Sequence, residues 1–228
     1  MSKPRGLRFS ARARTRVVRM FPRALARFGI FKVEVFGREF IPPKGQAVIV
    51  ACNHISMADP VYVWGAMRRA TVTVAMAELW RWPLVGAMMR DLGQIPVDRK
   101  SRTSGARVIR LAVRILKHGG LLLIFPEGKC SKTGELLPFK RGVVELAFET
   151  MSPVVPAGIR GTNKVLPLGS KKLNRHAQVH LNFGGPMHPL TYLRAAHGNL
   201  TTAKEQFMGD LRYSIQELST TDYSKMTS

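Results

Sequence analysis

The chain has 228 residues, 45% of them hydrophobic and 22% charged, which allows one main domain with a buried core and excludes a disordered chain. Its 36 Lys and Arg outnumber 14 Asp and Glu, so the formal net charge is +22. Such a balance indicates a polyanionic partner, which is nucleic acid, an anionic membrane surface or a phosphorylated substrate.

The cysteines and the first residues of the chain indicate the cellular compartment. Cys52 and Cys130 are the two cysteines, interpreted as free thiols, and the basic N-terminus lacks the apolar run and cleavage site of a signal peptide. We therefore expect a reducing, cytosolic compartment. No window holds the roughly 18 to 20 apolar residues of a membrane-spanning helix, so the chain is expected not to span a bilayer.

Residues 1–32 contain many Arg, two Lys and no acidic residue, interleaved with aliphatic and aromatic side chains. This mixture predicts a basic amphipathic helical segment that lies on a membrane surface, with aromatics among the headgroups and arginines on lipid phosphates. The alternative is a helix that packs on its own domain and leaves a solvated basic face. Both interpretations can hold together.

Short apolar runs alternate with helix-like segments from residue 33 to the end. The pattern predicts an α/β domain over residues 33–228, in which helices flank a mixed sheet. The predicted strands cover residues 46–52, 71–76, 121–125, 152–159 and 177–185. The predicted helices cover residues 61–70, 104–120, 142–150 and 201–218.

The stretch NHISMADP, residues 53–60, places His54 five residues before Asp59. On one helix these side chains would point about 140° apart, so they must straddle a strand-to-helix turn if they touch. In such a turn the carboxylate can accept the Nδ1 proton and leave Nε2 as a base, which is the logic of a catalytic triad without its nucleophile. Alternatively, Asp59 caps a helix that has Pro60 at its first position, and His54 is an ordinary loop residue.

Three further stretches are also expected where predicted strands end, which is where the loops of an α/β sheet converge. LGQIPVDRK, residues 92–100, predicts a rigid turn whose Arg99 suits a phosphate, or else a plain surface turn. FPEGKCSKTGELLPFKRG, residues 125–142, surrounds Glu127 with cations, as a clamp for a substrate hydroxyl or as a structural ion pair. PVVPAGIRG, residues 153–161, predicts a wall of the site.

In their order and spacing these four stretches resemble the sequence blocks of the glycerolipid acyltransferase family. The resemblance implies that His54 is the general base and that Asp59 orients it. It implies a phosphate-binding Arg99, and a Glu127–Gly128 pair that positions the acceptor or its loop. The full set of predicted substrate-binding residues is Asn53, Arg99, Glu127, Gly128, Lys129, Lys140 and Arg141.

The resemblance also implies an activity. An acyl group would pass from acyl-CoA or acyl carrier protein to the free hydroxyl of 1-acylglycerol-3-phosphate and give phosphatidate. Transfer would be direct, without an acyl-enzyme, which agrees with the lack of a G-x-S-x-G nucleophile elbow. No cofactor is expected, and the remaining histidines lack metal-ligand spacing. The chain would be peripheral, on the cytoplasmic face of the membrane.

One departure from the family pattern leaves other acceptors open. The family usually continues Thr-Arg-Ser after the Glu-Gly of the third block, whereas this chain has Lys129, Cys130 and Ser131. Because an ammonium does not replace a guanidinium as a phosphate ligand, the acceptor can instead be another lysophospholipid, glycerol phosphate or a lipid-linked molecule. A further alternative is a non-catalytic basic module that binds membrane or nucleic acid, although no nucleic-acid motif is recognisable and nucleic acid is not expected.

Overall fold

The computed structural model describes residues 33–67, 69–98, 101–167, 169, 174 and 176–222, without the side chains of Leu84, Arg102 and Thr103. The segment predicted as a basic surface helix, residues 1–32, lies outside the described residues, and so does Arg99.

A seven-stranded sheet forms the centre of the molecule. Its strands are β1 Val33–Phe36, β2 Val48–Cys52, β3 Thr71–Met76, β4 Ile95–Val97, β5 Leu121–Ile124, β6 Val154–Arg160 and β7 Val179–Phe183. They lie in the order β1-β7-β6-β2-β5-β3-β4, and β7 runs antiparallel to β6 while the other neighbours are parallel. The predicted α/β fold with a mixed sheet is confirmed.

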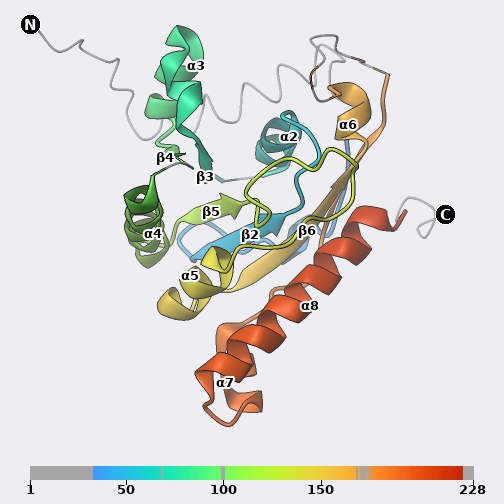
Figure 1. Ribbon diagram of the computed structural model, residues 1–228. Coiled ribbons are helices and arrows are strands. Elements are labelled where there is room, and N and C mark those ends of the chain that lie inside the picture. Colours follow the sequence, from blue (N-terminus) through green and yellow to red (C-terminus); the bar gives the residue numbers. More distant parts are fainter. Residues whose placement is uncertain are drawn as a thin grey trace, which may run out of the picture.

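Helices cover both faces of this sheet. They are α2 Asp59–Ala66, α3 Pro83–Asp91, α4 Arg102–Lys117, α5 Gly142–Thr150, α6 Thr162–Val165, α7 Pro189–Ala195 and α8 Leu200–Thr220, with 3-10 turns η1 Arg38–Phe40 and η2 Ala77–Arg81. The core between sheet and helices contains α2, α3 and α6 on one face and α4, α5, α7 and α8 on the other. Figure 1 shows α5 and α8 on one side of the sheet and α2 on the other.

The central strand β2 shows why two layers of helices are needed. Its residues alternate between the faces, with Val50 and Cys52 in one core and Ile49 and Ala51 in the other, and all four are fully buried. A strand that is apolar at every position is stable only when both faces are covered. The apolar residues of β2 lie within residues 46–52, which the sequence predicted to be a strand.

The segment Ile95–Val97 corrects one prediction. Sequence patterns indicated a rigid turn there, but the segment is the edge strand β4, which pairs with β3 through Val74, Ala75 and Met76. Pro96 fits at this position because an edge strand has one side on which no N–H needs a partner. The sequence also gave no sign of β1 or of helices α3 and α7.

The C-terminal helix α8 packs directly on β6. A side chain at Gly158 would overlap the backbone of Leu218 and Ser219, so the close approach of helix and strand requires glycine. In the described part of the chain, no helix is both long enough and apolar enough to cross a membrane.

Candidate active site

Three of the predicted motifs meet at one edge of the sheet. Strands β2, β5 and β6 are parallel neighbours, so the residues after Cys52, Ile124 and Arg160 emerge side by side. The loop from β5 to α5, residues 125–141, lies beside the turn between β2 and α2 (Figure 1), and Ser131 N–H donates to the carbonyl oxygen of His54 at 2.7 Å. This edge therefore gathers residues that lie far apart in the sequence.

His54 and Asp59 form the pair that their spacing predicts. His54 Nδ1 lies 2.7 Å from Asp59 Oδ2, and the Asp59 side chain is fully buried. Because the carboxylate accepts hydrogen bonds, Nδ1 is the nitrogen that donates to it, which leaves Nε2 as the nitrogen that can accept a proton. The ring of His54 also stacks on Phe125, with 4.2 Å between ring centroids, so the imidazole is fixed in orientation.

Asp59 is held by more than the histidine. Its Oδ2 accepts the backbone N–H groups of Ile55 at 2.7 Å and Ser56 at 2.8 Å, and its Oδ1 accepts the hydroxyl of Thr162. Asp59 is the first residue of α2, and these four partners in the described part of the chain all lie outside that helix. The carboxylate therefore orders the turn that contains His54, which argues against the alternative in which it caps α2.

Glu127 clamps two loops through backbone groups. Its Oε1 accepts the N–H of His54 at 2.7 Å, and its Oε2 accepts the N–H of Leu137 at 2.8 Å. Burial raises the pKa of Glu127, and these two hydrogen bonds partly oppose that rise. Both of its carboxylate oxygens thus accept backbone N–H groups of described residues. This favours the interpretation that Glu127 holds the loop.

Asn53 makes a similar contact across the sheet. Its Nδ2 donates to the carbonyl oxygen of Ile159 at 2.9 Å, and its Oδ1 accepts the N–H of Ile159 at 2.7 Å. The side chain is buried and aligns β2 with the end of β6. A direct contact of Asn53 with substrate stays a prediction.

The cations of the third motif lie on the surface of the same loop. Lys129, Lys140 and Arg141 are exposed. The side chain of Lys140 packs over Gly128, whose φ of 69° is in the left-handed region. The end of the flexible Lys140 side chain could move away from an added Cβ, so it is the left-handed backbone conformation that favours glycine at this position. Contacts of Gly128, Lys129, Lys140 and Arg141 with substrate also stay predictions.

An apolar cavity of about 440 Å³ begins at His54. It forms where the sheet divides, because β3 pairs with β5 only from Thr71 to Thr73 and then pairs with β4 from Val74 to Met76. Its walls include Trp64 from α2, Ala75 from β3, Met88 and Met89 from α3, Val108 and Ile109 from α4, and Val143 and Leu146 from α5. Gly128 and Lys140 also line it, so His54 and one cation border an apolar space.

Two side chains that lie two residues from His54 along the chain have other environments. The hydroxyl of Ser56 donates to the carbonyl oxygen of Leu166 at 3.0 Å. Cys52 is fully buried, and burial raises the pKa of its thiol well above the ordinary value. Within the described ranges, no group of three or more His, Cys, Asp or Glu could hold a metal ion.

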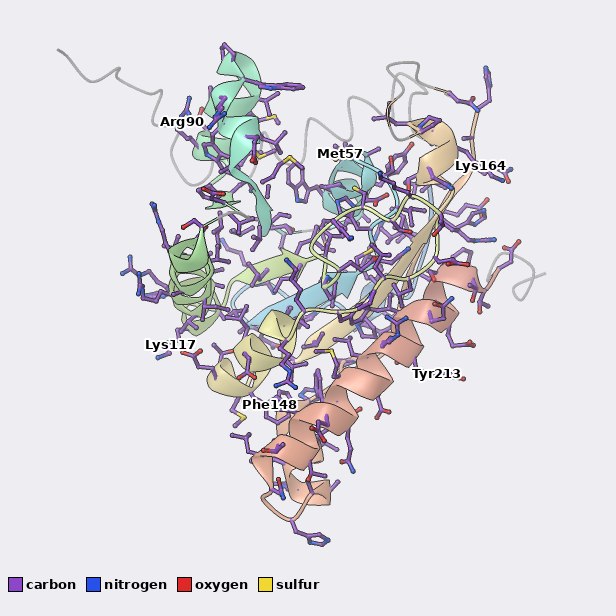
Figure 2. All side chains as sticks on the ribbon, viewed as in Figure 1. Met57, Arg90, Lys117, Phe148, Lys164 and Tyr213 are labelled. Carbon is purple, nitrogen blue, oxygen red and sulfur yellow. The ribbon has the colours of Figure 1, made fainter. Side chains whose placement is uncertain are left out.

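Cys130 is a site residue that the sequence did not identify. Its Sγ lies 3.0 Å from His54 Nε2 and 3.8 Å from the sulfur of Met57. Figure 2 labels Met57 beside α2. No local pattern predicts this contact, since 76 residues separate Cys130 from His54. The only hint in the sequence was that Cys130 stands where the family usually has Arg.

Comparison with known proteins identifies the family of this chain. The family model described as Acyltransferase matches residues 32–160, which contain the first three motifs and all but the last residue of the fourth. A chloroplastic 1-acyl-sn-glycerol-3-phosphate acyltransferase of Brassica napus is 28% identical over 161 residues, 71% of this chain and 46% of that protein. One from Bacillus subtilis is 29% identical over 157 residues, 68% of this chain and 74% of that protein. The chain thus matches less than half of the plant relative.

The fold has a counterpart among solved structures. The crystal structure of the 1-acyl-sn-glycerophosphate acyltransferase PlsC from Thermotoga maritima superposes with a TM-score of 0.74 at 26% identity, covering 95% of this chain and 85% of that one. Sequence motifs, sheet and family match therefore agree, and the chain belongs to the Acyltransferase family.

Proposed function

We propose that this chain transfers a fatty acyl group from a thioester donor to the free hydroxyl of 1-acylglycerol-3-phosphate and so forms phosphatidate. The observation that carries the proposal is a histidine whose Nδ1 is fixed on a buried carboxylate and whose ring lines an apolar cavity of about 440 Å³. The names of the Brassica and Bacillus relatives support the acceptor.

His54 is the general base of this reaction. The acceptor hydroxyl donates to Nε2, and His54 takes its proton as the oxygen attacks the thioester carbon. Asp59 stabilises the imidazolium that forms, because Oδ2 lies 2.7 Å from Nδ1. The C–O bond forms, the C–S bond breaks, and the proton passes to the departing thiolate. This course is direct and uses no acyl-enzyme.

The cavity suits the acyl chain of the donor. Its lining is mostly apolar, and an alkyl chain gains about 0.8 kcal/mol for each CH₂ removed from water. A chain that enters from the His54 end leaves its carbonyl carbon beside the base. Acyl-CoA and acyl carrier protein present the same thioester, and both are donors in this proposal.

The phosphate of the acceptor binds to the cations around this edge. Lys140 borders the cavity, Lys129 and Arg141 flank it on the same loop, and all three are exposed. Arg99 completes the set in the proposal, as the family resemblance implies. A net charge of +22 draws such anionic substrates toward the protein.

The site requires access to lipid, and we place the chain peripherally on the cytoplasmic face of the membrane. Residues 1–32 provide the contact, because a basic segment with interleaved aromatics binds anionic headgroups. Deletion of residues 1–30 should weaken sedimentation with anionic vesicles more than it changes turnover of detergent-solubilised substrate. Unchanged vesicle binding would place the membrane contact elsewhere.

A second candidate function keeps the chemistry and changes the acceptor. It is favoured by Cys130, which stands where the family usually has Arg and whose thiol contacts the base nitrogen. Another lysophospholipid, glycerol phosphate or a lipid-linked acceptor then takes the acyl group.

The test is mass-spectrometric detection of phosphatidate from lysophosphatidate and palmitoyl-CoA, with purified wild type and His54→Ala side by side. Product from wild type alone supports the proposal. Product only with a different acceptor favours the second candidate. No product across acceptors and both donors would refute acyl transfer and favour a basic binding module.

A further inference from the structure

The thiol of Cys130 occupies the place where an acceptor hydroxyl must meet the base. Its Sγ lies 3.0 Å from His54 Nε2, which is hydrogen-bond distance for a thiol and an imidazole nitrogen. The neighbouring residue fixes this position, because Ser131 N–H donates to His54 carbonyl oxygen at 2.7 Å. This backbone contact holds residue 130 beside His54, and the side-chain rotamer of Cys130 then brings Sγ to Nε2.

Cys130, His54 and Asp59 together have the arrangement of a cysteine nucleophile, its base and the group that orients the base. Both links are within hydrogen-bond distance, 3.0 Å from sulfur to Nε2 and 2.7 Å from Nδ1 to Oδ2. A thiolate formed by proton transfer to His54 would be stabilised by the imidazolium, which in turn faces a buried carboxylate. The direct course described above does not use this thiol.

The thiol also lies beside the space proposed for the acyl chain. Met57 and His54 both line the cavity, and Cys130 Sγ contacts both of them. Cys130 is partly exposed, whereas Cys52 is fully buried. The carbonyl carbon of a donor whose chain fills the cavity would thus come within reach of Cys130 and not of Cys52.

We propose that Cys130 accepts the acyl group from the thioester donor when no acceptor hydroxyl is bound, and that acyl-Cys130 can then pass it to the acceptor. This inference rests on the proposed function and adds a covalent course beside the direct one. Thiol–thioester exchange replaces one thioester by another, so the acyl group keeps its reactivity.

Both steps balance. In the first, His54 takes the thiol proton, Cys130 Sγ bonds to the acyl carbon, the C–S bond to the donor breaks, and the proton leaves with the donor thiol. In the second, His54 takes the proton of the acceptor hydroxyl, its oxygen bonds to the acyl carbon, the C–S bond to Cys130 breaks, and Cys130 regains a proton.

The experiment incubates the full chain with palmitoyl-CoA without acceptor and measures intact mass, with the modified residue located by peptide mapping. Wild type and Cys52→Ala should gain one acyl group, removable by neutral hydroxylamine, on Cys130. Cys130→Ser should gain no hydroxylamine-labile group. His54→Ala should form the adduct about 10²-fold more slowly or worse, because its base is missing.

A chase then tests the second step. Acyl-Cys130 protein, freed of palmitoyl-CoA, should lose its acyl group and yield an equal amount of acylated product when acceptor is added. The inference is overturned if wild type forms product from both substrates but no adduct, if the acyl group is found on another residue, or if the adduct persists after acceptor is added. A different result would refute the proposed function itself, namely that wild type with both substrates makes no product.

Discussion

Replacing Asp59 by Asn tests what the carboxylate contributes to His54. The three donors that surround Oδ2 are His54 Nδ1 and the N–H groups of Ile55 and Ser56, and the group beside Oδ1 is the Thr162 hydroxyl. An Asn amide can place its oxygen toward the three donors and its NH₂ toward Thr162, whose hydroxyl can also accept. The variant should therefore fold and keep the His54 tautomer, so that mainly the negative charge is lost.

The magnitude follows from the geometry. With 2.7 Å between Nδ1 and Oδ2, the charge centres of imidazolium and carboxylate lie about 4 Å apart, which gives about 4 kcal/mol at an effective dielectric constant of about 20. That charge pair exists only while His54 holds the proton, so its loss raises the barrier. At about 1.4 kcal/mol per tenfold, kcat should fall by about 10³-fold.

The assay compares kcat for lysophosphatidate and palmitoyl-CoA in wild type, Asp59→Asn and the matched control Thr162→Val, with thermal unfolding of each. Thr162→Val removes the bond to Oδ1 and leaves the charge, so it should lower stability by about 1.5–3 kcal/mol and kcat only a few-fold. A folded Asp59→Asn with kcat within about threefold of wild type would refute the electrostatic role of Asp59.

Three further predictions concern the clamp, the cavity and the helix contact. Because burial raises the pKa of Glu127, the folded protein holds that proton more tightly than the unfolded chain, and stability should fall as pH rises from 4.5 toward the folded pKa. The urea concentration at the unfolding midpoint should fall across this pH range in wild type and not in Glu127→Gln. An equal dependence of the midpoint on pH in both proteins would contradict this role of Glu127. Ala75→Phe, which fills part of the cavity, should shift donor preference toward shorter acyl chains by about tenfold, measured by competition between donors, and an unchanged preference would place the chain elsewhere. Gly158→Ala should lower the free energy of unfolding by about 1–3 kcal/mol or more, seen as a lower melting temperature, because the new methyl group meets the backbone of α8; an unchanged melting temperature would show that the helix shifts freely.

The sequence predicted the features that depend on neighbours along the chain. Apolar runs gave β2, β3, β5, β6 and β7, and an apolar stripe followed by two glycines gave α4, because the period of burial is a local property. The spacing of His54 and Asp59 allowed the two side chains to touch only across a turn, and the 2.7 Å contact shows that they do. The short strand β4 was mistaken for a turn, since Pro96 forbids helix and only its pairing with β3 makes it a strand.

The tertiary structure decided everything that joins distant residues. The order of the strands brings Glu127 to the N–H of His54, Thr162 to Asp59 and Cys130 to Nε2. The cavity likewise exists because β3 leaves β5 for β4, which no run of residues reveals. Sequence periodicity determines which face of an element is buried, but only the packed sheet determines which loops share an edge, and the residues of the candidate site lie on those loops.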